Sequence, residues 1–128
     1  MSNKNAIITK KRRENLVKAS AGAITLPKIV GMAFGNGGVD ESGTVISPTE
    51  SQSELTSEIF RKEIDRYLFP TATTCRYECT LTENELAGDD ISEIGLYDEN
   101  GDIVCIKAFK KKGKDSDLEM TFTLDDVF

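Results

Sequence analysis

The chain has 128 residues, of which 38% are hydrophobic and 30% charged, and its net charge is −6. A chain of this size forms one domain with a single core, and its composition excludes an intrinsically disordered protein. No apolar run approaches the roughly 20 residues that cross a bilayer, and no apolar signal core follows the basic N-terminus, so we expect no membrane segment and synthesis in the cytoplasm.

The first predicted element is a helix that begins after Thr9, a residue suited to the N-cap, and ends near Gly22. The helical spacing i, i+3, i+4 and i+7 is met by Arg13, Leu16, Val17 and Ser20. The apolar face of this helix is narrow. We therefore expect the helix to pack on a sheet edge or a partner rather than fill a core.

Basic residues gather in this first helix. Residues 1–20 hold six of the 16 Lys and Arg residues and one of the 22 acidic residues, so the rest of the chain is acidic. The KKRR run from Lys10 to Arg13 is of a kind that can contact nucleic acid. The acidic body and the lack of interleaved aromatic residues favour a solvated helix face instead, and we predict no nucleic-acid binding.

A strand is predicted over Ile24–Phe34, because its apolar residues alternate with others. Pro27 restricts this strand to a sheet edge or to the strand's beginning, because proline has no backbone N–H to donate. The glycine-rich stretch Gly35–Gly43 then predicts a flexible loop.

A second short helix is predicted from Thr49 to about Ser57. Thr49 as the cap and Gln52 three residues later form a capping box. The segment Ile59–Phe69 alternates apolar and charged residues, although its length also fits a continued helix. We favour a strand there.

The segment Ile91–Phe109 predicts a β-hairpin, with its turn at the pair Asn100 and Gly101, which suits positive φ angles. The return strand Ile103–Ala108 is apolar on both faces apart from Lys107. We therefore expect it to be central and covered on both sides.

Two further strands show clean alternation, Thr73–Thr82 and a last one from Leu118 to Leu124. No repeat, linker or second domain is evident. The sequence therefore predicts a small single α+β domain over residues 1–128, mostly antiparallel sheet with an N-terminal helix and a second short helix.

The chain lacks the residues that most enzymes and metal sites use. It has no His, and its three cysteines include no CxxC pair. Cys75 and Cys79 lie four apart in a predicted strand, about 13 Å at the usual rise, which exceeds the reach of a disulfide. We predict buried reduced cysteines, no catalytic residues, no metal and no cofactor.

Two loops match ligand-binding sequences only in part. DENGD places Asp98, Asn100 and Asp102 as a calcium loop does, but Ile103 stands where that loop needs Gly. GMAFGNGG lacks the Lys-Ser/Thr pair of a phosphate loop. A hairpin turn and a mobile loop are the favoured interpretations.

Four segments in order suggest a family: ITKKRRENLVKA, MAFGNGG, SPTESQSELTSEIFRKEI and EIGLYDENGDIVCIKAF. Together they resemble the N-terminal domain of phage tail-collar fibre proteins, over about Ile8–Phe109. The sequence departs from the family pattern at Asn36, where related chains often carry an acid. It also stops at Phe128, where related chains continue into a long fibre shaft.

The resemblance implies a structural component of a phage or prophage tail, made in the bacterial cytoplasm and carried in the virion tail. Such a domain attaches a tail fibre to the baseplate, so the implied partners are a baseplate protein and the fibre shaft, in a homotrimer. We expect docking through the basic helix and the glycine-rich loop. The residues assigned to docking are Lys10, Lys11, Arg12, Arg13 and Asn36.

An alternative is a small module that binds a ligand such as a host-surface glycan. Tyr67 and Tyr77 are its candidates for stacking against a sugar ring. The chain is only 7% aromatic and has no Trp, which counts against this alternative.

Overall fold

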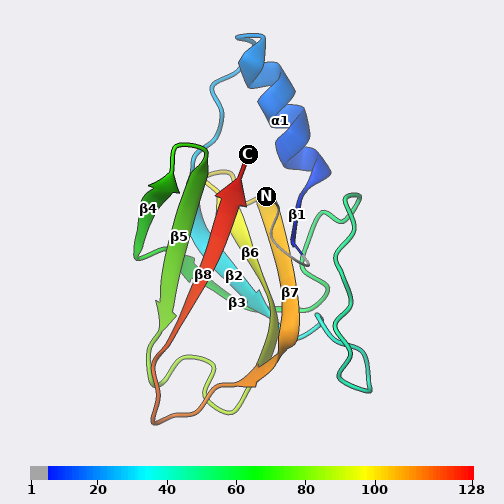
Figure 1. Ribbon diagram of the computed structural model, residues 1–128. Helices are drawn as coiled ribbons and strands as arrows, with labels where there is room; N and C mark the ends of the chain where they lie inside the picture. The colour runs from blue at the N-terminus through cyan, green and yellow to red at the C-terminus, as the bar shows by residue number, and fades with distance from the viewer. Residues whose placement is uncertain (1–5) are drawn as a thin grey trace.

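A computed structural model describes residues 6–128 and shows two antiparallel sheets packed face to face (Figure 1). The larger sheet has the strand order β1-β7-β6-β2-β3, and the smaller has β4-β5-β8. The strands are β1 (Ala6–Ile8), β2 (Ile29–Gly35), β3 (Glu58–Glu63), β4 (Arg66–Thr71), β5 (Thr74–Leu81), β6 (Asp90–Asp98), β7 (Ile103–Gly113) and β8 (Met120–Val127). The helix is α1 (Lys10–Ser20).

The predicted α+β class is wrong, because the described residues form a β-rich domain with one helix. At the predicted second helix, one of the two capping-box contacts forms: the Thr49 N–H donates to the Gln52 side chain at 3.4 Å. The Gln52 N–H donates to the backbone carbonyl of Thr49 at 3.0 Å rather than to its side chain. They close a turn and no helix follows. The N–H groups of Thr56 and Ser57 are instead taken by the carboxylate of Glu93, each at 2.8 Å.

Two predicted strands have different limits in the structure. The strand expected from Ile24 begins only at Ile29, where β2 starts to pair with β6. The segment Ile59–Phe69 is two strands in different sheets, β3 and β4. At the corner between them, the Ile64 N–H donates to β2 and the Asp65 N–H to β5, so the chain crosses from one sheet to the other.

The predicted hairpin is confirmed as β6 and β7, and β7 is paired on both sides, with β6 and with β1. Its turn differs from the expected one, because only Gly101 has a positive φ, 85°, and Asn100 does not. The carboxylate of Asp98 accepts the N–H groups of Asn100 and Asp102 at 2.9 and 3.1 Å. This side chain, together with Gly101, shapes a three-residue turn.

The core lies between the sheets and extends to the outer face of the larger one. The buried residues between the sheets are Met32, Phe34, Cys79, Leu81, Ile91, Ile94, Leu96, Val104, Cys105, Phe122 and Leu124. On the outer face, Ala33, Ile103 and Ile106 form a second cluster under Leu55, which comes from the loop 36–57. The expected two-sided burial of Ile103–Ala108 is therefore confirmed, apart from the half-buried Lys107.

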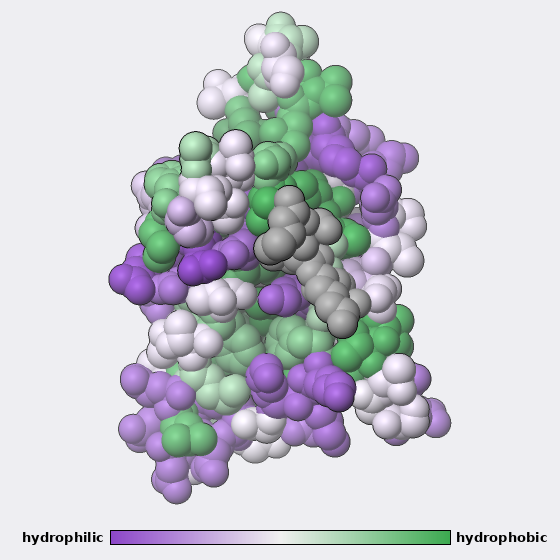
Figure 2. Space-filling view, in the orientation of Figure 1, coloured by the Kyte–Doolittle hydropathy of each residue, from purple (hydrophilic) through white to green (hydrophobic). Residues whose placement is uncertain are grey.

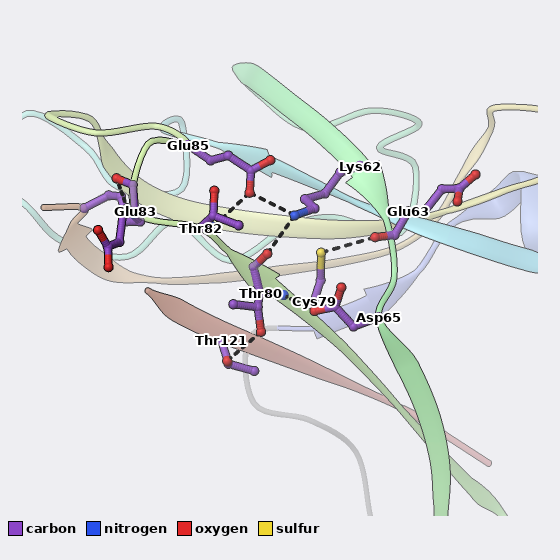
Figure 3. A network of polar contacts seen from close by, with 10 residues as sticks. Lys62, Glu63, Asp65, Cys79, Thr80, Thr82, Glu83, Glu85 and Thr121 are labelled. Carbon is purple, nitrogen blue, oxygen red and sulfur yellow. Dashed lines mark hydrogen bonds and ion pairs between the residues drawn. The ribbon is translucent and has the colours of Figure 1, made fainter. Parts of the chain in front are cut away.

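A lysine links the two sheets at the β3 edge (Figure 3). Lys62 on β3 donates to the Thr80 carbonyl on β5 at 2.8 Å and forms an ion pair with Glu85, also at 2.8 Å. The hydrogen bond between Lys62 and Glu85 raises the pKa of the lysine and lowers the pKa of the carboxyl group. The pair therefore stabilises the packing of one sheet on the other.

Replacing Lys62 with Met should lower the free energy of unfolding near neutral pH by about 1.5–3 kcal/mol, the usual size for a charged hydrogen bond. The pKa of Glu85 is depressed below its ordinary 4.5, so its stabilisation is present above that pH and is lost as the pH falls through the folded-state value. The stability gap between Lys62→Met and the wild-type protein should therefore shrink on acidification.

Urea unfolding of both proteins at neutral and acidic pH measures this gap, with the exposed Lys110→Met as the control. A gap of the same size at both pH values would show that the ion pair does not contribute as described.

Candidate partner-docking site

The start of α1 is fixed to β7 through Thr9. The Thr9 side chain caps the helix by accepting the Arg12 N–H at 3.3 Å, as predicted, and its hydroxyl donates to the Ile103 carbonyl at 2.9 Å. The Thr9 N–H also donates to the Val104 carbonyl at 3.1 Å. The helix therefore leaves the sandwich in a defined direction.

Arg12 is buried between the helix and the smaller sheet. Its guanidinium lies 2.8 Å from the carboxylate of Asp126 on β8, and both side chains are over nine-tenths buried. The guanidinium carbon also lies 5.6 Å from the centre of the Phe128 ring. Arg12 thus joins α1 to the second sheet, and its charge is matched inside the molecule.

The other basic residues of the KKRR run lie on the surface. Lys10 and Lys11 are exposed, whereas Arg13 contacts Glu50, with one nitrogen 3.4 Å from its carboxylate and another 3.0 Å from its carbonyl oxygen. Beyond its first turns α1 stands out from the sheets (Figure 1), and Val17 is 70% exposed. We call α1 the arm.

The carboxylate of Glu93 fixes the beginning and the end of the loop 36–57. It accepts three backbone N–H groups, from Gly37, Thr56 and Ser57, each at 2.8 Å. Glu93 is 2% exposed, and these three hydrogen bonds replace those that its carboxylate loses to water on burial. The glycine-rich segment is predicted to be a flexible loop, but its first residues are fixed by the hydrogen bond from Gly37 to Glu93.

The glycines of this segment are required by close contacts. The Gly38 N–H donates to the Ser92 hydroxyl at 2.9 Å, and a Cβ on Gly38 would lie 2.0 Å from the Ser92 carbonyl oxygen. Asn36 is exposed, and its N–H donates to the Ser57 carbonyl at 3.0 Å. It follows the end of β2 that points away from α1 (Figure 1), so the structure does not bring Asn36 to the basic residues.

An aromatic hollow opens between the sheets beside the start of β2. The rings of Tyr67 and Phe69 on β4 are 60% and 69% exposed and meet edge to face at 5.7 Å. Tyr77 on β5 lies 6.3 Å from Tyr67 and is half-buried. Leu26 and Pro27 form part of the lining of this hollow, whose volume is about 380 Å³. We call it the aromatic mouth.

Sequence reasoning brought out Tyr67 and Tyr77 but missed the mouth. The pattern Phe60, Ile64 and Leu68 suggested a single apolar face, whereas the change of sheet after β3 turns Tyr67 and Phe69 toward the inner side. Once β4 is treated as a strand of its own, Tyr67 and Phe69 fall on the same face of it, because they lie two residues apart. The pairing of Tyr67 with Tyr77 places that face toward the core.

Two of the three thiols, Cys79 and Cys105, are buried as predicted. Burial raises the pKa of Cys79 and of Cys105 to about 12 in each case, so both are protonated at neutral pH. Cys75 is also free and is partly buried. Within residues 6–128 no cluster of His, Cys, Asp or Glu side chains is arranged to hold a metal ion, and no helix is long and apolar enough to span a membrane.

Comparison with known protein families decides the class of this protein. A family model described as phage tail-collar fibre protein, N-terminal, matches residues 1–123. The chain belongs to this family. No curated protein and no solved structure gave a significant match. The resemblance carried by the four sequence segments is therefore confirmed, and this tail-collar fibre domain is a structural component of a phage tail that interacts with other tail proteins.

Replacing Arg12 with Met should strongly destabilise the tail-collar fibre domain, because Asp126 would remain buried without its partner. Removing one member of a buried ion pair typically costs about 3–5 kcal/mol. Arg13→Met, in the same helix, removes an exposed contact and should cost less than about 1 kcal/mol. Urea unfolding compares the two variants, and equally small losses would contradict a structural role for Arg12.

Proposed function

We propose that this domain attaches a tail fibre to the baseplate, with the arm, α1, as its docking element. The observation that supports this proposal is that α1 is fixed to the two sheets at its start and is otherwise exposed. Thr9 and Arg12 hold its first turn, while Lys10, Lys11 and Val17 remain on the surface. A rigidly mounted helix loses little conformational entropy when a partner binds it.

The charge of the arm favours an acidic surface on the baseplate. Exposed lysines speed the encounter with such a surface and orient it, more than they add to the final affinity. Arg12 is not part of this exposed charge, because Asp126 already neutralises it. Asn36 lies at the other end of β2, and we do not include it in the arm.

The fibre shaft is the second partner in this proposal. We expect the fibre to be a homotrimer, as the family resemblance implies, with the two-sheet body as the mount that carries the arm. No residue of the described chain is assigned a catalytic role, and we propose no enzymatic activity for the domain.

Reversing two charges on the arm tests the docking role. The variant Lys10→Glu/Lys11→Glu should reduce incorporation of the fibre into tails by more than about tenfold, which corresponds to about 1.4 kcal/mol. Both side chains are exposed, so folding should be unaffected. The measurement is the amount of fibre protein in purified tail particles assembled from a fibre-deficient background.

The matched control is Lys110→Glu/Lys111→Glu, which makes the same charge change on exposed residues of β7. Normal incorporation of both double variants, or an equal loss in both, would contradict docking through α1.

A second candidate function, glycan binding, has one observation in its favour. The structure does bring Tyr67 and Tyr77 together, with ring centres 6.3 Å apart. The residues that line the aromatic mouth include no carboxylate or amide side chain, the groups that pair most readily with sugar hydroxyls. We therefore favour a protein partner, and a specific glycan-array signal would reverse this preference.

A further inference from the structure

The aromatic mouth exposes side chains that would be core residues if the sandwich continued. Tyr67 pairs with Tyr77 across β4 and β5, on the face of the smaller sheet that packs against the larger one. The larger sheet does not extend over Tyr67 and Phe69, which stay exposed. The rings of Tyr67 and Phe69 therefore lie on the inner face of the smaller sheet but are not covered by the larger sheet.

Exposed apolar residues gather at the end of the molecule that carries α1. Figure 2 shows this apolar region above a largely polar lower end. Apart from Ile46 and Leu118, the exposed large apolar side chains of the described chain belong to α1, the linker after it, β4 and the last residue: Val17, Ile24, Tyr67, Phe69 and Phe128. Exposed apolar side chains gathered at one end, with aromatic anchors among them, are typical of protein interfaces.

The charges around the mouth are basic. Its lining contains no acidic residue, and the exposed positive charge comes from Lys28 and from Lys18 on the neighbouring arm, because Asp126 already matches the charge of Arg12. A carboxylate is close outside the lining, since Glu99 accepts the Lys28 N–H at 2.8 Å. Two copies joined at this end would bring their basic arms together, which disfavours a second copy as the occupant.

The edge of β4 is not suited to pairing with a further strand. Pro70 removes one backbone donor from it, and the pairing of β4 with β5 is irregular between Leu68 and Thr71. Recognition at this place therefore depends on side chains that enter the mouth rather than on strand addition.

We propose that the aromatic mouth binds an acidic segment of another tail protein that inserts apolar side chains between Tyr67, Phe69 and Leu26. The inference rests on the proposed docking role, because it places a second contact at the end of the molecule that carries the arm. The rings supply the apolar contact, and Lys28 with the lysines of α1 selects the negative charge.

The test uses peptides from a random twelve-residue display library, selected on the whole domain and then synthesised. We expect the selected peptides to be enriched in Asp and Glu beside apolar residues. Tyr67→Ser/Phe69→Ser should weaken their binding, measured by fluorescence polarisation, by more than about tenfold. Leu118→Ser, which removes an apolar side chain exposed by 54% elsewhere, should leave binding unchanged.

Several outcomes would overturn the proposal. These are an absence of selected peptides, selection of basic ones, or equal binding to the Tyr67→Ser/Phe69→Ser variant. Self-association of the wild-type domain that this variant abolishes would identify a second copy as the occupant, and specific glycan binding that it abolishes would identify a sugar. Circular dichroism verifies that the variant is folded.

The peptide test and the test of docking through α1 can fail independently of each other. If no acidic peptide needs the mouth while Lys10→Glu/Lys11→Glu still blocks fibre incorporation, only the mouth proposal is wrong. If peptides bind as expected while the lysine variant is incorporated normally, the docking role of α1 is wrong.

Discussion

The carboxylate of Glu93 is the interaction on which the arrangement of this domain most depends. It sits on β6, the middle strand of the larger sheet, and accepts backbone N–H groups from both ends of the loop 36–57. Each charged hydrogen bond of this kind contributes about 1.5–3 kcal/mol. Because the loop is held at both ends, Leu55 can cover the outer face of the sheet, and β7 becomes buried on both sides.

The same body supports the surface at the other end of the molecule. Arg12 and Asp126 connect α1 to the smaller sheet, and Lys62 connects the two sheets at another edge. These internal charges are paired inside the molecule, whereas the lysines of the arm and the rings of the aromatic mouth are exposed. A tail-fibre domain built in this way separates the charges that hold it together from those that can meet another protein.

Sequence reasoning succeeded where the signal is local and failed where distant residues decide. The alternation in Thr73–Thr82 and the hairpin around Gly101 could be predicted, because side-chain period and turn chemistry are properties of neighbouring residues. The second helix could not be excluded, since Glu93, which takes the N–H groups of Thr56 and Ser57, is 37 and 36 residues away. Likewise, Arg12 looks like part of a solvated basic run until Asp126 is placed beside it.

Hydrogen exchange at single amides, compared between the wild-type domain and Glu93→Gln, tests the central role of this carboxylate most directly. In the wild-type protein we expect the amides of Gly37, Thr56 and Ser57 to be protected like those of the β6–β7 hairpin. In Glu93→Gln these three amides should lose protection while the amides that pair β5 with β8 keep it. Rapid exchange of the three amides in the wild-type protein, or unchanged protection in the variant, would contradict it.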